Sequence, residues 1–300
     1  MTKHVAVLMG GWSAEREVSL VSGAACSTAL REAGYQVTAI DVQRDVGALL
    51  TRLFPRPDVV FNALHGRYGE DGCIQGLLNI LDIPYTHSGL LASALAMDKP
   101  AAKRLFWAAE IPVAEDAVVT LEELKEGDPL ERPYVVKPPN EGSSVGVFII
   151  REQGDINAVI ERWPFGDEAM VERFIPGREL TVAVMGDRPL AVTEITTEHG
   201  FYDYDAKYVA GGSRHLLPAP LDAEVYDEAL RLSARACAVL GCRGVARADF
   251  RYDGDNLFLL EVNTQPGMTP TSLVPEQAAH VGISFAELCT WMVESAECDR

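Results

Sequence analysis

The first part of the chain alternates short apolar runs, typical of buried strands, with longer stretches typical of helices. The expected strands lie at 4–10, 36–42 and 58–64, and the expected helices lie at 15–33 and 74–82. Strand–helix–strand units with short links form a parallel sheet covered by helices, which predicts the α/β class. Ligands of such sheets gather at the carboxyl ends of the strands. Glu15 and His65 follow two of these strands, so both are candidate site residues.

Beyond about residue 95 the pattern changes to helices mixed with β runs that favour hairpins, an α+β arrangement. Helices are predicted at 96–110 and 223–241, and a capping box of Ser284 and Glu287 predicts the start of a last helix. The final residues, ESAECDR, are typical of a frayed helix end. We expect an N-terminal domain, a central domain and a C-terminal domain at 1–95, 96–180 and 181–300.

The composition argues against several classes of protein. Lys and Arg total 26 while Asp and Glu total 44, and the net charge of −18 disfavours binding to nucleic acid or to anionic membranes. No run of 18 apolar residues and no signal peptide is found, which predicts a cytoplasmic protein. The six cysteines form no C-x-x-C pair and are expected as free thiols. The glycine patterns of a dinucleotide-binding Rossmann site and of a P-loop are also missing.

A Gly/Ser-rich loop between two β runs is the first candidate site. In YVVKPPNEGSSVGV, at 134–147, Lys137 ends one run, and the loop contains Gly142, Ser143 and Ser144. Backbone N–H groups and hydroxyls of such a loop can hold a polyphosphate, and a lysine can meet its charge. An ordinary hairpin with a turn would give the same local pattern.

A predicted hairpin at 246–268, joined at its DGD turn, is the second candidate. Glu261 and Asn263 share a face because strand side chains alternate, and Asp249 can lie beside them on the partner strand. Three oxygen-bearing side chains on one face suit a Mg²⁺ ion that bridges ATP phosphates. A solvated hairpin face is the alternative.

Other stretches are weaker candidates when each is considered alone. Glu172 and Glu179 flank RFIPGR and could border a nucleoside, although a strand followed by a polar turn is the simpler explanation. Glu15, after a Gly-rich turn, could accept an ammonium group or could only complement the dipole of the following helix. The loop LHGRYGEDG, at 64–72, has the composition of a plain surface turn.

Considered together, these stretches are far more specific. The chain resembles the D-alanine–D-alanine ligase family of the ATP-grasp superfamily. The resemblance rests on GGWSAEREVSL, LHGRYGEDG, SALAMDKPAAK, VVKPPNEGSSVGV, VERFIPGREL, FYDYDAKY and RADFRYDGDNLFLLEVNTQPGMTPTSLVPEQA. It implies an ATP-grasp fold preceded by a parallel-sheet, Rossmann-like pre-ATP-grasp domain.

The resemblance also implies a nucleotide and metal site between two β-rich domains. The residues implied at the ATP phosphates are Lys99, Lys137, Ser143, Ser144 and Lys207. Those implied around adenine and ribose are Glu172, Phe174, Ile175 and Glu179. Two Mg²⁺ or Mn²⁺ ions would be held by Asp249, Glu261 and Asn263.

The implied reaction joins two D-alanine molecules for peptidoglycan precursor synthesis. The carboxylate of the first attacks the γ-phosphate of ATP, and the amine of the second attacks the resulting acyl phosphate. The implied substrate contacts are Glu15 on the first ammonium, Arg247 and the Gly267 N–H as oxyanion stabilisers, Ser272 and Leu273 at the second carboxylate, and His65 nearby. For His65, shaping the pocket and transferring a proton both stay open.

A loop at 199–215 resembles the segment that closes over the site in this family. Ser143, Tyr208 and Glu15 resemble a hydrogen-bonded trio that ties this loop to the first domain. Tyr208 favours D-alanyl-D-alanine as the product, and a D-alanine–D-lactate ligase or another ATP-grasp carboxylate–amine ligase is the alternative. The resemblance further implies a homodimer formed through the first domain, and a monovalent-cation requirement stays open.

Overall fold

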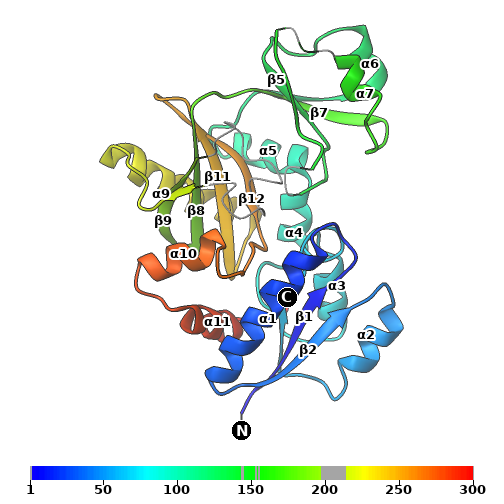
Figure 1. The fold of residues 1–300 in the computed structure, drawn as a ribbon, viewed down its shortest axis with the longest axis vertical. Helices are drawn as coiled ribbons and strands as arrows, with labels where there is room; N and C mark the ends of the chain where they lie inside the picture. Colours follow the sequence, from blue (N-terminus) through cyan, green and yellow to red (C-terminus); the bar gives the residue numbers. More distant parts are fainter. Residues whose placement is uncertain (1, 143–144, 153, 155, 197–213, 300) are drawn as a thin grey trace.

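A computed structural model describes the chain except for residues 1, 143–144, 153, 155, 197–213 and 300. Its N-terminal part contains a parallel three-stranded sheet in the order β2-β1-β3 (Figure 1). The elements are β1 (His4–Gly10), β2 (Gln36–Val42), β3 (Val59–Asn62), α1 (Arg16–Glu32), α2 (Val46–Arg52) and α3 (Cys73–Ile80). The three strands and two helices predicted for this part are confirmed, and their ends move by at most two residues.

A second sheet, at the top of Figure 1, has four antiparallel strands in the order β4-β7-β5-β6. Its elements are β4 (Asp116–Thr120), β5 (Tyr134–Lys137), β6 (Phe148–Ile150), β7 (Glu168–Arg173), α6 (Leu121–Glu126) and α7 (Ile156–Ile160). A core of its own, which includes Leu124, Tyr134 and Val159, joins the two helices to the sheet. The Gly/Ser-rich segment therefore connects two neighbouring antiparallel strands, as predicted.

The third sheet has five antiparallel strands in the order β10-β9-β8-β11-β12. Its strands are β8 (Arg178–Met185), β9 (Arg188–Thr196), β10 (Arg214–Leu216), β11 (Val245–Tyr252) and β12 (Leu257–Asn263), and α9 (Ala223–Leu240) packs on it. The predicted β11–β12 hairpin is confirmed. In its turn, the side chain of Asp253 accepts hydrogen bonds from the N–H groups of Asp255 and Asn256 at 2.9 and 2.7 Å.

The prediction of a single helix at 96–110 is wrong at its start. The chain forms two helices, α4 (Leu90–Met97) and α5 (Lys99–Ala108), with Asp98 between them in an extended conformation. The Asp98 side chain accepts a hydrogen bond from the N–H of Ala101 at 2.9 Å, and Pro100 lies in the first turn of α5. A capping carboxylate and a proline at this place start a new helix, so Lys99 becomes the first residue of α5.

The last part of the chain returns to the N-terminal sheet. The helices α10 (Leu273–His280) and α11 (Phe285–Glu294) follow β12, and α11 lies beside α1. One hydrophobic core contains Val7 of β1 and Phe61 of β3 together with Val245 of β11 and Met292 of α11. The N-terminal and C-terminal parts are therefore packed against each other, and the domain boundaries at 95 and 180 stay predictions.

The residues after α11 are held in place, so the prediction of a frayed end is wrong. The capping box of Ser284 and Glu287 starts α11 as predicted. Beyond the helix, Glu297 forms an isolated antiparallel bridge with Tyr85, and Asp299 is hydrogen-bonded to the N–H of Leu90. These contacts are tertiary, so no local pattern in the sequence could predict them.

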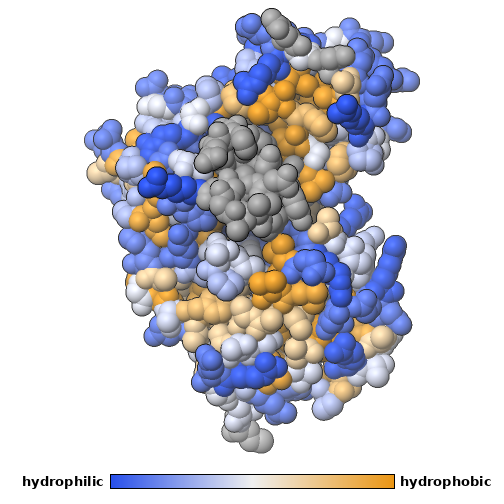
Figure 2. Space-filling model, viewed as in Figure 1, coloured by the Kyte–Doolittle hydropathy of each residue, from blue (hydrophilic) through white to orange (hydrophobic). Residues whose placement is uncertain are grey.

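The surface of the face seen in Figure 1 is uneven in polarity. Figure 2 shows hydrophobic residues gathered over the upper sheet and across the middle of the molecule, where the outline narrows between the upper and lower parts. Among the helices that the structure describes, none has both the length and the apolar character needed to cross a bilayer.

Candidate active site

A cavity of about 560 Å³ lies where the N-terminal part meets the end of the β11–β12 hairpin. The predicted residues that line it are Glu15, His65, Lys99, Arg247, Glu261, Asn263, Gly267, Ser272 and Leu273. Glu15 stands at the N-cap of α1 directly after the turn that follows β1, and His65 lies in the loop after β3. The carboxyl ends of the parallel strands thus contribute to this cavity, as expected for an α/β sheet.

A second cavity, of about 110 Å³, lies between the upper sheet and the hairpin. Its lining includes the predicted residues Lys99, Lys137, Glu172, Phe174, Ile175, Glu179, Asp249 and Glu261. Lys99 and Glu261 line both cavities, so these two side chains stand where the cavities meet. Within the part of the chain that the structure describes, the residues that line the second cavity come from position 99 onward.

The β11–β12 pairing brings the predicted metal ligands together. Asp249 lies directly opposite Glu261, and Arg247 lies directly opposite Asn263, so all four side chains share one face. The Arg247 guanidinium donates to both carboxylate oxygens of Asp249, at 2.8 and 2.7 Å. Lys99 lies 3.7 Å from the Glu261 carboxylate. Each of the two carboxylates therefore lies beside a positively charged side chain.

This donor set fits a hard divalent cation. It consists of two carboxylates and one amide oxygen, the ligands that Mg²⁺ and Mn²⁺ prefer. Within the described ranges no cluster of three His, Cys, Asp or Glu side chains is arranged for a metal. The Asn263 side-chain oxygen accepts a hydrogen bond from the N–H of Gln265 at 2.8 Å, and this bond fixes its direction.

Two buried lysines hold Glu172. Lys103 donates to one carboxylate oxygen at 2.6 Å, and Lys137 contacts the other at 2.5 Å. Burial would raise the pKa of Glu172, but Lys137 and Lys103 outweigh burial and lower it below its usual value. Glu172 is therefore ionised in the folded protein. Lys103 was not predicted as a site residue, because its local signal is limited to its position one helical turn after Lys99.

The first cavity contains an unusual group of acids. Glu70, on the loop after His65, was missed by sequence analysis because a Gly-rich polar loop looks like a surface turn. Burial, reinforced by Glu15 and Glu261, raises the pKa of Glu70 well above its usual value. Burial lowers the pKa of His65, although Glu15 acts in the opposite direction. The cavity can therefore offer a neutral imidazole at His65 and, at Glu70, a carboxyl group that holds its proton more tightly than an exposed glutamate does.

The predicted second-substrate residues lie at the start of α10. Ser272 is the N-cap of this helix, and its hydroxyl accepts a hydrogen bond from the N–H of Thr269 at 3.0 Å. A Cβ atom placed on Gly267 would lie 2.9 Å from the Ser272 hydroxyl oxygen, so glycine leaves room beside this serine. The N-terminus of a helix favours a carboxylate because its N–H groups point outward.

Four predicted site residues fall outside the part of the chain that the structure describes. They are Ser143, Ser144, Lys207 and Tyr208, and most of the predicted loop at 199–215 lies there too. The described start of the Gly/Ser-rich loop does reach the first cavity. A Cβ atom placed on Gly142 would lie 3.2 Å from a carboxylate oxygen of Glu70.

Comparison with known proteins identifies the family. Residues 46–88 match the model of the D-Ala–D-Ala ligase N-terminus, and residues 105–294 match that of the C-terminus. The D-alanine–D-alanine ligase of Rhodospirillum rubrum is 62% identical over 301 residues and that of Paramagnetospirillum magneticum is 61% identical over 307, with 100% of each chain covered.

Solved structures give the same result for the fold. Crystal structures of D-alanine–D-alanine ligase from Bacillus anthracis, without and with ATP, match with TM-scores of 0.86 and 0.84 at 31% and 30% identity. Each match covers 98% of this chain and 97% of the solved chain. The predicted ATP-grasp architecture is thereby confirmed. The two family models and these full-length matches lead to one conclusion: the chain belongs to the D-alanine–D-alanine ligase family.

Proposed function

We propose that this protein joins two D-alanine molecules into D-alanyl-D-alanine, a peptidoglycan precursor, with conversion of ATP to ADP and phosphate. One observation carries the proposal: a cavity lined by nucleotide-type residues meets a cavity lined by ammonium- and carboxylate-binding residues at Lys99 and Glu261. A phosphoryl group transferred at this meeting point would pass directly to a carboxylate in the larger cavity. The carboxylate then gains a phosphate leaving group, which makes it reactive toward an amine.

The nucleotide belongs in the smaller cavity. We assign Lys99 and Lys137 to the phosphates, together with Ser143, Ser144 and Lys207 on the strength of the sequence motif. Glu172, Phe174, Ile175 and Glu179 border the adenine and ribose. Arg251 supports this wall, since it donates to the Ile175 carbonyl at 3.1 Å and to the Glu179 carboxylate at 3.2 Å.

We assign Mg²⁺ or Mn²⁺ to Asp249, Glu261 and Asn263, whose oxygen atoms fit such an ion. A bound divalent cation would neutralise phosphate charge during transfer. The chain's own residues prepare this place. Thr181 donates to Asp249 at 2.6 Å and Gln265 donates to Asn263 at 2.8 Å, so two of the three ligands are oriented by neighbouring groups.

The substrates belong in the larger cavity. Glu15 is nine-tenths buried, and its side chain accepts hydrogen bonds from the ammonium group of the first D-alanine. Arg247 and the Gly267 N–H stabilise the oxyanion that develops at its carbonyl, a contribution of about 3 kcal/mol per donor. Ser272, Leu273 and the start of α10 receive the carboxylate of the second D-alanine. His65, held neutral by its lowered pKa, can accept a proton from the attacking amine.

A hydrogen-bonded trio of Glu15, Ser143 and Tyr208 is proposed to hold the segment at 199–215 over the bound substrates. Exclusion of water at this point would protect the acyl phosphate from hydrolysis. Tyr208 also supports an amine rather than a hydroxyl as the second nucleophile.

We further propose a cytoplasmic homodimer that forms through the N-terminal part. Ile80 of α3 and Leu91 of α4 are exposed by 83% and 66%, and they make this surface apolar. Sedimentation analysis of Ile80→Asp tests this assignment, and a dimer that persists unchanged would contradict it.

One assay tests the ligation. ADP release is measured with Mg²⁺-ATP in three separate reactions, which contain D-alanine, L-alanine, or D-alanine together with D-lactate. The products are identified by mass spectrometry. We expect ADP release with D-alanine and formation of the dipeptide. An ester formed in preference to the dipeptide would favour the D-lactate ligase instead. Absence of stimulation by D-alanine, with or without D-lactate, would reject the proposal.

A further inference from the structure

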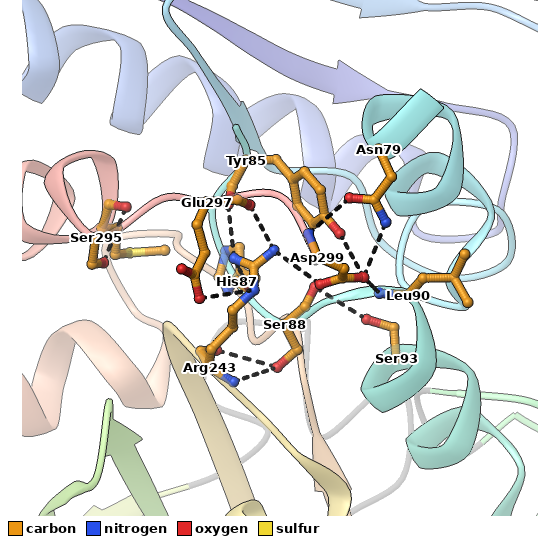
Figure 3. Close-up of polar contacts among 11 residues, drawn as sticks. Asn79, Tyr85, His87, Ser88, Leu90, Ser93, Arg243, Ser295, Glu297 and Asp299 are labelled. Atoms are coloured by element: carbon orange, nitrogen blue, oxygen red, sulfur yellow. Dashed lines mark hydrogen bonds and ion pairs between the residues drawn. The ribbon is translucent and has the colours of Figure 1, made fainter. Parts of the chain in front are cut away.

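A guanidinium group joins three separate segments of the chain (Figure 3). Arg243 donates to the carbonyl oxygens of Tyr85 and His87 at 3.1 and 2.8 Å, and to that of Glu297 at 2.7 Å. The guanidinium also stacks on the Tyr85 ring, with its central carbon 4.6 Å from the ring centroid. Five bonded hydrogens in a fixed plane make arginine suited to such a junction.

Asp299 completes the junction from the segment after α11. Its carboxylate accepts hydrogen bonds from the N–H of Leu90 at 2.7 Å, the Asn79 amide at 3.0 Å and the Tyr85 hydroxyl at 3.2 Å. The Arg243 guanidinium lies 3.5 Å from the same carboxylate. Because the α4 N-cap, Gly89, has no side chain, Asp299 supplies the missing cap from a distant part of the chain.

The carboxylate of Asp299 is charged in this setting. Burial would raise the pKa of Asp299, but the bonds from Leu90 and Asn79, together with Arg243, outweigh burial and lower it. The Arg243–Asp299 pair therefore combines an ion pair with hydrogen bonds to three neighbouring groups. Such a pair holds its partners in one geometry more firmly than a simple surface ion pair does.

The junction is connected to the active site through one strand. Arg243 lies two residues before the first residue of β11, and Arg247 lies four residues further along the chain. The backbone at Gly244 also packs closely against the backbone at His87, because a Cβ atom placed on Gly244 would lie 2.9 Å from the Cα atom of His87. The start of β11 consequently cannot shift without moving the segment at 85–88 of the N-terminal part.

The two cavities depend on this connection in different ways. The larger cavity has one wall from the N-terminal part, with Glu15, His65 and Glu70, and another wall from β11, β12 and α10. Among the described residues, those that line the smaller cavity begin at Lys99. A change in the placement of the N-terminal part against β11 would therefore alter the larger cavity and leave the smaller one intact.

We propose that Arg243 and Asp299 are positioning residues that set the separation of the two walls of the substrate cavity. Neither is among the described residues that line the two cavities, and both act through β11 and through the start of α4. This inference rests on the proposed ligation, since it assigns D-alanine to the larger cavity and ATP to the smaller. If the inference is right, substitution of Arg243 or Asp299 raises the KM for D-alanine and leaves the KM for ATP nearly unchanged.

The test measures steady-state kinetics of Asp299→Ala and Arg243→Lys with each substrate varied in turn. We expect the KM for D-alanine to rise roughly two- to thirtyfold, the range typical of residues that act through the structure, while the KM for ATP stays within about twofold. Asp299→Asn keeps an oxygen that can accept from Leu90 and should recover part of the loss. The matched control is Arg231→Ala, which breaks an arginine–carboxylate contact of 2.6 Å to Glu228 on the surface of α9 and should change neither KM.

The outcomes separate positioning from simple stabilisation. A lower melting temperature with both KM values unchanged, or an equal rise in both, would overturn the proposal. If Asp299→Ala does not fold, Asp299→Asn and Arg243→Lys decide by the same comparison. A wild-type protein that makes no dipeptide would reject the proposed function, whereas an active wild type with unaltered D-alanine KM in the variants rejects this inference alone.

Discussion

The side chains of Asn62 and Gln265 are hydrogen-bonded to each other although they are 203 positions apart. The Asn62 amide donates to the Gln265 side-chain oxygen at 2.8 Å and to the Gly69 carbonyl at 2.9 Å. Gln265 also donates from its amide to the Leu64 carbonyl, and both side chains are buried. The end of β3, the loop that carries His65 and Glu70, and the end of β12 are thereby held together.

Gln265→Leu should reduce both stability and catalysis. The change keeps the approximate size but removes the partners of Asn62 and Leu64, which costs about 1–3 kcal/mol in the free energy of unfolding for buried polar groups. The loop beside the cavity loses its attachment, so we expect kcat/KM for D-alanine to fall about tenfold. Urea unfolding and initial rates measure the two effects. Gln43→Leu, at an exposed glutamine, is the control, and equal behaviour of the two variants would contradict the assignment.

Glu261→Gln should weaken the use of the divalent cation. The amide keeps the shape of the side chain but lacks the negative charge that faces Lys99 and Asp249 at the hairpin. We expect the Mg²⁺ concentration for half-maximal rate to rise roughly 10–100-fold. Activity is titrated with Mg²⁺ and with Mn²⁺, and chelation by EDTA should abolish it in both proteins. Glu228→Gln, on the surface of α9, should titrate like the wild type. A titration of Glu261→Gln that coincides with the wild type would exclude Glu261 as a ligand.

Lys103→Met should destabilise the protein and raise the KM for ATP. The Lys103 ammonium bonds to Glu172 and to the Ala114 carbonyl, both at 2.6 Å, and lies 3.0 Å from Asp116. Loss of one partner of a buried ion pair costs about 3–5 kcal/mol in the free energy of unfolding. The pKa of Glu172 should rise because one of its two lysines is gone. Denaturant unfolding and ATP kinetics test this, with Lys125→Met at an exposed position as the control. Unchanged ATP kinetics would show that Lys103 has no part in shaping the nucleotide cavity.

His87 should make the protein less stable in mild acid. Burial lowers the pKa of His87 to about 4, whereas the unfolded chain has a value of about 6.5. Between these values the unfolded state binds a proton that the folded state does not bind, so stability is fully present above pH 6.5 and falls as the pH drops toward 4. The full loss would be roughly 3 kcal/mol.

His87→Asn tests this pH dependence because an asparagine can still donate to the Val245 carbonyl, which His87 contacts at 3.2 Å. The variant should lose less stability than the wild type when urea unfolding is compared at pH 7 and pH 4.5. His280→Asn, at an exposed histidine, should follow the wild type. Parallel loss of stability in all three proteins would exclude His87 as the cause.

Local patterns in the sequence were sufficient for most of the elements. Strand β1 and its partner β2 begin and end where the apolar runs do, and the capping box at Ser284 starts α11. Such features depend on neighbouring residues only, so they can be predicted without a fold. The break between α4 and α5 was missed, although Asp98 and Pro100 carry a local signal for it.

The candidate site was predictable to the extent that its residues lie in short motifs. Asp249, Glu261 and Asn263 could be placed on one face because the alternation of side chains in a hairpin is regular. Glu70, Lys103 and Gln265 were missed, since their importance comes from burial and from partners in distant segments.

The sequence by itself determined the kinds of elements, the α/β and hairpin architecture, and many of the chemical groups of the candidate site. Only the tertiary structure decided which groups meet, how their pKa values shift, and that the segment after α11 joins Arg243 to the start of α4. The physical reason is the range of the interactions. Propensity, capping and side-chain alternation act over a few residues, whereas burial and ion pairing depend on segments that the folded chain alone brings together.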